Sequence, residues 1–115
     1  METIKENFTF KRAYHKGEKH TGKLVVVYSL KRKSGIRFGI TVSKKLGKAV
    51  VRNGVRRKIK ECLRFLKPYM LDGSDIVLVA RGAAVNATFE ELFYSLKAQL
   101  EAGGLIGEET VHYPY

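Results

Sequence analysis

The sequence predicts an α+β fold, a two-layer α/β sandwich in which helices pack on one central sheet. Apolar β-branched runs alternate along the chain with segments whose apolar residues recur every three or four positions. With 115 residues and 44% hydrophobic side chains, the chain has the size and composition of one folded domain. We therefore expect a single domain over residues 1–115, with a core from about residue 4 to 102 and a mobile tail over residues 103–115.

The first part of the chain is expected to form a helix and two strands. The helix spans residues 4–14 and stops at Gly17. Strands follow at residues 24–30 and 36–42, and a short polar connection predicts that they pair as an antiparallel hairpin. In the second strand every other residue is apolar, so one face is expected to be buried: Ile36, Phe38, Ile40 and Val42. A third short strand fits residues 43–47.

The second part is expected to add a helix, a strand and a last helix. The first of these helices begins between residues 48 and 53 and ends before Pro68. Residues 76–80 are an unbroken apolar run, typical of a strand covered on both faces. Thr88 and Glu91 have the spacing of a capping box, so the last helix opens there and ends at two glycines, 103 and 104. Asp72 and Asp75 fit turn chemistry better than a metal site.

Positive charge is concentrated in one part of the chain. The formal net charge is +11, and residues 19–60 hold fourteen Lys or Arg residues without a single Asp or Glu. A soluble protein normally intersperses the two signs, and so local a field repels itself unless an anion neutralises it. The distribution therefore predicts a polyanionic partner.

The helix expected before Pro68 separates apolar from cationic residues. On a helical wheel one stripe is apolar: Val55, Ile59, Cys62, Leu63 and Leu66. The adjacent face is almost purely cationic, whereas solvated helices usually pair Glu with Lys four residues apart. We interpret this face as anion-binding, with a solvated charged face as the alternative. It comprises Asn53, Arg56, Arg57, Lys60, Arg64 and Lys67.

The sequence offers no catalytic constellation of its own. It contains no HExxH motif, paired cysteines, phosphate loop or nucleophile elbow, and it assigns no metal ligand. Cys62 is the only cysteine, so no disulfide can form within the chain and a reducing cytoplasm is expected. No apolar run approaches the ~20 residues of a membrane span, so no membrane partner is expected.

Two stretches and the basic helix carry a family resemblance. They are Arg37-Phe-Gly-Ile-Thr-Val-Ser-Lys-Lys45 and Gly47-Lys-Ala-Val-Val-Arg-Asn53, followed by the cationic helix. Together they resemble the protein subunit of bacterial ribonuclease P, over residues 4–100. The resemblance implies a fold of the ribosomal protein S5 domain 2 type with a left-handed βαβ crossover, against the usual right-handed rule.

The resemblance also implies a function. An RNA subunit acting with Mg²⁺ would cleave precursor tRNA endonucleolytically and remove its 5′ leader, and this chain would be a monomeric protein subunit without catalytic residues. The basic-helix residues would bind that RNA: Arg52, Asn53, Arg56, Arg57 and Lys60. The cleft residues would bind the leader: Phe10, Tyr14, Tyr28, Arg37, Ser43 and Lys44.

Two alternatives remain at this point. Spacing alone favours core packing for Phe8, Phe10 and Tyr14, while Lys11 and Arg12 among these aromatics permit base stacking beside phosphate contacts. A structural RNA-binding protein, such as a ribosomal protein of similar fold, would share the charge pattern, while a DNA-binding regulator lacks support because no tight helix-turn-helix surrounds the basic helix. Gly54 departs from the Arg-Asn-Arg pattern of the family, but on the wheel it points away from the cationic face.

Overall fold

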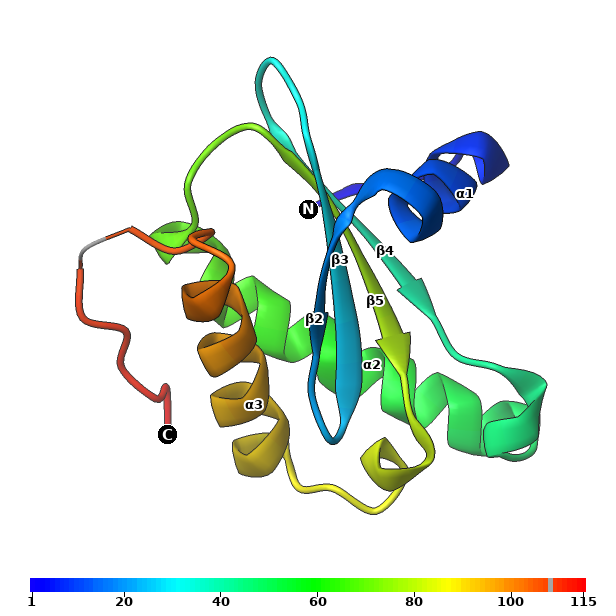
Figure 1. Cartoon of the computed structure of the whole chain (residues 1–115). Helices are drawn as coiled ribbons and strands as arrows, with labels where there is room; N and C mark the ends of the chain where they lie inside the picture. The colour runs from blue at the N-terminus through cyan, green and yellow to red at the C-terminus, as the bar shows by residue number, and fades with distance from the viewer. Residues whose placement is uncertain (108) are drawn as a thin grey trace.

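A computed structural model describes residues 1–107 and 109–115 (Figure 1). Glu108, within the predicted tail, lies outside the described residues. The helices and strands, in chain order, are β1 (Glu2–Thr3), α1 (Asn7–Lys16), β2 (Glu18–Thr21), β3 (Val25–Lys31), β4 (Ile36–Thr41), α2 (Ala49–Leu66), β5 (Ser74–Ala80) and α3 (Phe89–Ala102). Short 3₁₀ helices lie at Lys44–Leu46 (η1), Lys67–Tyr69 (η2) and Gly82–Ala84 (η3).

The five strands form one sheet in the order β1-β4-β5-β3-β2. β5 lies at its centre, antiparallel to β3 and parallel to β4. The predicted hairpin between residues 24–30 and 36–42 is therefore wrong, because β5 separates the two strands and β3 pairs with β2 instead. The alternating pattern determines which side chains face the core, but it carries no information about which strand lies alongside.

The segment after β4 is also not a strand. Residues 44–46 form η1, and the hydroxyl of Ser43 caps it by accepting a hydrogen bond from the backbone N–H of Lys45 at 3.2 Å. Gly47 follows with φ of 138°, a backbone conformation that favours glycine. This turn directs the chain from β4 into α2.

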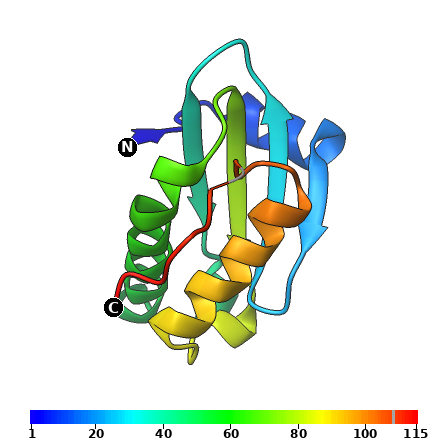
Figure 2. The ribbon, with the colours of Figure 1, turned by 90° about the vertical axis from the view of Figure 1, so that its left-hand side faces the viewer.

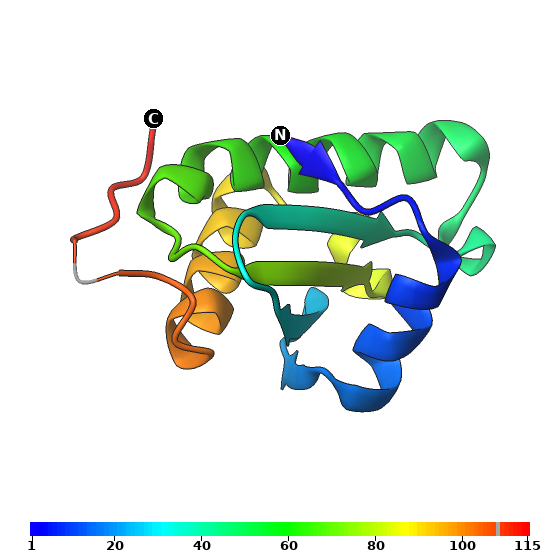
Figure 3. The same cartoon turned by 90° about the horizontal axis from the view of Figure 1, so that it is seen from above.

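The crossover β4–α2–β5 joins two parallel neighbouring strands and is left-handed (Figure 2). Right-handed crossovers dominate in proteins, so this hand is a specific feature of the fold. It places α2 beside α3 on one face of the sheet, with α1 on the opposite face (Figures 2 and 3).

The main core lies between the sheet and the helices α2 and α3. The stripe predicted for α2 is buried, as are the alternate residues Val25 and Val27 of β3 and Ile76 and Leu78 of β5. The predicted capping box opens α3: Thr88 accepts from the N–H of Glu91, and the Glu91 carboxylate accepts from the N–H of Thr88.

The face of the sheet opposite α2 and α3 is covered by α1. Ile4, Ala13 and Val77 form a small buried cluster there, with Phe10 and Tyr28 packed at its border. α1 thus adds a partial layer on the face that α2 and α3 leave free (Figure 3).

The last residues pack on α3, which the weak pattern of the tail did not indicate. Val111 is buried, and the ring of Tyr113 lies 5.2 Å from that of Phe93 and 5.4 Å from that of Tyr94. The mobility expected of residues 103–115 stays a prediction.

Candidate nucleic-acid interface

The basic side of α2 is built by the helix period. Val55, Ile59 and Cys62 face the core, so the positions between them must face outward. Asn53, Arg57 and Lys60 are exposed, while Arg52 and Arg56 are half-buried. No described carboxylate forms a salt bridge with any cation between residues 42 and 60. The predicted cationic face is therefore present and unneutralised as far as Lys60. Farther along the helix, Arg64 is paired with Glu61, at 2.6 Å between Nη2 and Oε1.

The start of α2 adds to this positive field. Its first turn holds no acidic residue, and the N-cap position is Lys48, whose side chain makes no capping hydrogen bond. The free backbone N–H groups and the helix dipole favour an anion at this end. Exposed Lys44 and Lys45 lie in η1, directly before it. A phosphate chain along α2 would meet both side-chain and backbone donors.

Two of the basic-helix residues are held by hydrogen bonds. The Arg52 Nε donates to the carbonyl of Gly47 at 3.1 Å, and the Arg56 Nη1 donates to the Asn53 Oδ1 at 3.1 Å. These contacts orient the guanidinium groups without neutralising their charge. Fixing their rotamers lowers the entropy that binding a phosphate would cost.

The aromatic cleft residues come together between α1 and the sheet. The rings of Tyr14 and Tyr28 meet edge to face with centroids 5.1 Å apart, and the hydroxyl of Tyr14 lies 3.2 Å from the Thr41 Oγ1. Tyr14 is 41% exposed, so its ring borders solvent as well as packing on Tyr28. Phe10 lies over Gly39 of β4. The same rings therefore pack between α1 and the sheet and, at Tyr14, remain accessible to a ligand.

Arg37 differs from the other cleft residues because its charge is already paired. Its guanidinium donates from Nε and Nη2 to the two carboxylate oxygens of Asp75, at 2.8 and 2.9 Å, and from Nη1 to Glu6 at 3.1 Å. The hydrogen bond with Asp75 raises the pKa of Arg37 further above its ordinary range. Only 19% of the side chain is exposed. The leader contact predicted for Arg37 stays a prediction, and its observed role is to tie α1 to β5.

Ser43 and Lys44 lie just beyond the end of β4, and both are exposed. The Ser43 hydroxyl already accepts the capping hydrogen bond of η1. Lys44 has no carboxylate partner among the described residues. These two residues therefore lie between the cleft and the start of α2, where they connect the two predicted sets.

Sequence reasoning missed one cation of the cleft. The Lys19 Nζ lies 5.9 Å from the centroid of the Tyr28 ring, within the range of a cation–π contact. Lys19 faces Tyr28 across the β2–β3 pairing. The sequence does not indicate this contact, because only the pairing of β2 with β3 brings Lys19 next to Tyr28, and β2 was not predicted.

A small cavity joins the two predicted sets. Its volume is about 220 Å³, and its lining includes Phe10 from α1, Gly39 and Ile40 from β4, and Arg56 and Lys60 from α2. The basic helix and the aromatic cleft are therefore adjacent, although their residues are far apart in sequence. An RNA strand could contact both without leaving the surface.

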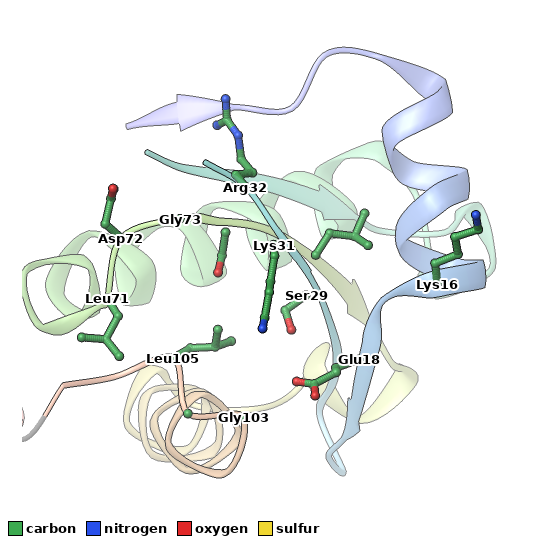
Figure 4. Close-up of a pocket in the computed structure, with 13 residues that line it drawn as sticks. Lys16, Glu18, Ser29, Lys31, Arg32, Leu71, Asp72, Gly73, Gly103 and Leu105 are labelled. Carbon is green, nitrogen blue, oxygen red and sulfur yellow. The ribbon is translucent and has the colours of Figure 1, made fainter. Parts of the chain in front are cut away.

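A larger cavity of about 540 Å³ lies beside the start of β5 and the end of α3 (Figure 4). Its lining mixes cations with the acids Glu18 and Asp72. In Figure 4, Lys31 and Ser29 point inward, whereas Arg32 and Asp72 point away. It contains none of the predicted site residues, and its mixed charges do not converge on one ligand.

The described residues contain no group of three or more His, Cys, Asp or Glu side chains that could hold a metal ion. Within the same residues, no helix has the length and apolar character needed to cross a lipid bilayer.

The fold and the site together define an α+β RNA-binding protein with an unneutralised basic helix beside an aromatic cleft. The ribonuclease P family profile matches residues 1–102, and the chain belongs to that family. The ribonuclease P protein component of Clostridium kluyveri is 39% identical over 105 residues, which cover 89% of this chain and 94% of that protein. That of Clostridioides difficile is 43% identical over 96 residues, covering 82% and 84%.

Solved structures agree with this membership. The ribonuclease P protein of Staphylococcus aureus superposes with a TM-score of 0.84 at 36% identity, covering 93% of this chain and 99% of that one. The protein from Thermotoga maritima superposes with a TM-score of 0.80 at 26% identity, covering 89% and 97%. The fold expected from the resemblance is confirmed.

Proposed function

We propose that this chain is the protein component of ribonuclease P and that it joins a catalytic RNA to the 5′ leader of precursor tRNA. The observation that carries the proposal is the cavity whose lining includes Phe10 from α1 together with Arg56 and Lys60 from α2. A surface that offers aromatic rings beside free cations suits a single strand that enters from a folded RNA. The enzyme that the complex forms is an endoribonuclease.

In this proposal α2 binds the catalytic RNA through phosphate contacts. The cations of its outer face displace counterions from the RNA, so affinity falls steeply as salt rises. Side-chain cations and the free N–H groups at the start of α2 act on the same strand.

The cleft binds the leader. Tyr14 and Tyr28 supply faces or edges for stacking. Lys19 supplies charge beside Tyr28, and Lys44 supplies charge in η1, beyond the end of β4. Base–aromatic stacking contributes about 1–3 kcal/mol per base and tolerates different sequences. Such tolerance suits an enzyme whose precursor tRNAs have different leaders.

Hydrolysis itself we assign to the RNA subunit with bound Mg²⁺, which would activate water and stabilise the phosphoryl charge. This chain holds the substrate in register and neutralises the phosphates nearby. We propose a single copy of the chain in each ribonucleoprotein. The cytoplasm is the compartment we expect, because the only cysteine, Cys62, is buried and unpaired.

The test is reconstitution with the cognate catalytic RNA at low magnesium concentration. Addition of the protein should increase the rate at which precursor tRNA is cleaved. It should also increase the affinity of the enzyme for precursor tRNA more than its affinity for leaderless tRNA. Tyr28→Ala should reduce the leader-dependent part by about 1–3 kcal/mol, the contribution of one stacked base. Equal losses for precursor and leaderless tRNA would assign the ring to the core. No stimulation by the wild-type protein, with binding to ribosomal RNA retained, would favour a structural RNA-binding protein.

A further inference from the structure

The outer face of α1 presents an aromatic ring that the cleft does not use. Phe8 is 63% exposed, whereas Thr9 and Ala13 of the same helix are buried. It is also the only phenylalanine among the strongly exposed apolar side chains of the described residues. A single exposed apolar residue is ordinary on a protein surface, so the surroundings of Phe8 must decide whether it has a role.

The neighbours of Phe8 on the helix are cationic or ionisable. At 100° per residue, Lys11 and Arg12 fall within about 60° of Phe8 around the helix, and His15 falls within about 20°. α1 contains no Asp or Glu, and all three neighbours are exposed. Neither Lys11 nor Arg12 forms a salt bridge with a described carboxylate. The ring therefore lies within a free positive patch, which is unsuited to an apolar partner and suited to a nucleic acid.

This patch is continuous with the cleft. Phe8, Lys11 and Tyr14 are spaced three residues apart, so they form one ridge along α1, with neighbouring Cβ atoms about 5–6 Å apart. The ridge begins at Tyr14, which contacts Tyr28 in the cleft, and ends at Phe8. α1 lies on the opposite side of the sheet from α2 and α3, so neither of those helices covers this ridge (Figure 3).

We propose that the ridge of Phe8, Lys11 and Tyr14 extends the leader-binding surface, so that single-stranded RNA leaving the cleft stacks a base on Phe8. Lys11 and Arg12 contact the phosphates on either side of that base. Stacking reads only the flat face of a base, so the site accepts any leader sequence of sufficient length. This proposal rests on the proposed function, because the leader must first enter the cleft.

The test is the affinity of the holoenzyme, reconstituted with its catalytic RNA, for precursor tRNAs with leaders of increasing length. Wild-type affinity should rise in two stages, first as the leader fills the cleft and then as it reaches Phe8. Phe8→Ala should remove the second stage, a loss of about five-fold or more, and leave the first unchanged. Lys11→Ala should reduce the second stage and its salt dependence.

Two controls make the result specific. Phe8→Tyr retains a stacking ring and should retain the second stage. Tyr94→Ala removes a ring that is 47% exposed on α3, away from the cleft, and should change neither stage. The proposal is overturned if wild-type affinity shows the first stage but no second stage, or if Phe8→Ala weakens short and long leaders equally. An absence of any leader-dependent gain in the wild type would instead contradict the proposed function.

Discussion

The ring of Phe10 in α1 occupies the space that a side chain at position 39 in β4 would need. A Cβ atom built on Gly39 would lie 2.6 Å from the Phe10 Cζ, well inside normal contact distance. Glycine at this position therefore lets α1 approach the sheet closely. The depth of the cleft and the place of its aromatic rings depend on this pair.

Gly39→Ala should displace the Phe10 ring and weaken binding of the leader. The added methyl group overpacks a buried site, so we also expect a loss of about 1–3 kcal/mol in the free energy of unfolding. The measurement is leader-dependent affinity together with a urea titration. Gly82→Ala is the matched control, because a Cβ at Gly82 meets no atom within 4 Å. Unchanged leader affinity in Gly39→Ala would mean that Phe10 has no part in the cleft.

Arg57→Ala combined with Lys60→Ala should weaken binding to the catalytic RNA and flatten its salt dependence by about one unit of slope per cation. Both side chains are exposed, so the melting temperature should hardly change. The control is Lys97→Ala with Glu101→Ala, which removes a salt bridge on α3 and leaves the net charge unchanged. An unaltered salt slope in the first variant would show that the basic face is only solvated.

Gly54→Ala should stabilise the protein without affecting RNA binding. The glycine lies inside α2, and a Cβ there meets no atom within 4 Å, so the helix should gain up to about 1 kcal/mol. Thermal unfolding measures this gain as a rise in melting temperature of several degrees. Gly54→Arg should fit equally well and restore the third basic residue of the family pattern. A fall in stability of either variant would contradict the open position of Gly54.

Arg37→Ala should destabilise the fold because it leaves Asp75 without its bidentate partner. The Asp75 side chain is 8% exposed, and its other cation, the Arg32 Nε, lies 3.6 Å away. Breaking a largely buried pair in this way costs about 3 kcal/mol. The same variant frees Glu6 and should loosen α1, which hydrogen exchange would detect as faster exchange of α1 amides. A variant of full stability but poor leader affinity would instead make Arg37 a direct RNA contact.

Cys62 should resist alkylation in the folded protein. Burial raises its pKa from 9.0 to about 12, so very little thiolate exists at pH 8. Because the unfolded thiol ionises first, this residue's contribution to stability is present below about pH 9 and is lost progressively as pH rises toward 12. Iodoacetamide labelling at pH 8, with and without denaturant, tests the first point. Rapid labelling without denaturant would contradict the burial of Cys62.

The buried face of α2 and the capping box of α3 could be predicted from sequence because their causes are local. Both patterns involve residues that lie within one or two helical turns of each other. They are the apolar period of Val55, Ile59 and Cys62 in α2 and the spacing of Thr88 and Glu91 at the start of α3. The positive surface can also be predicted from sequence, since a segment without acidic residues cannot neutralise its own charge. That the partner of this surface is an RNA was predicted only from the family resemblance.

The cleft was less predictable. Tyr14 and Tyr28 were expected there only through the resemblance, while Lys19 and the full pairing of Arg37 were missed. The residues that Arg37 contacts, Glu6 and Asp75, lie 31 and 38 positions away in the chain. Nothing in the local pattern of any of these residues indicates such partners.

The sequence by itself determined the three helices, the strands β3, β4 and β5, the buried face of α2 and its positive surface, because periodicity and charge are properties of neighbouring residues. Tertiary structure alone decided that β5 lies between β3 and β4, that Phe10 lies on Gly39, and that the cleft adjoins the basic helix. Strand order and helix placement depend on contacts between distant segments, which form only when the whole core is assembled.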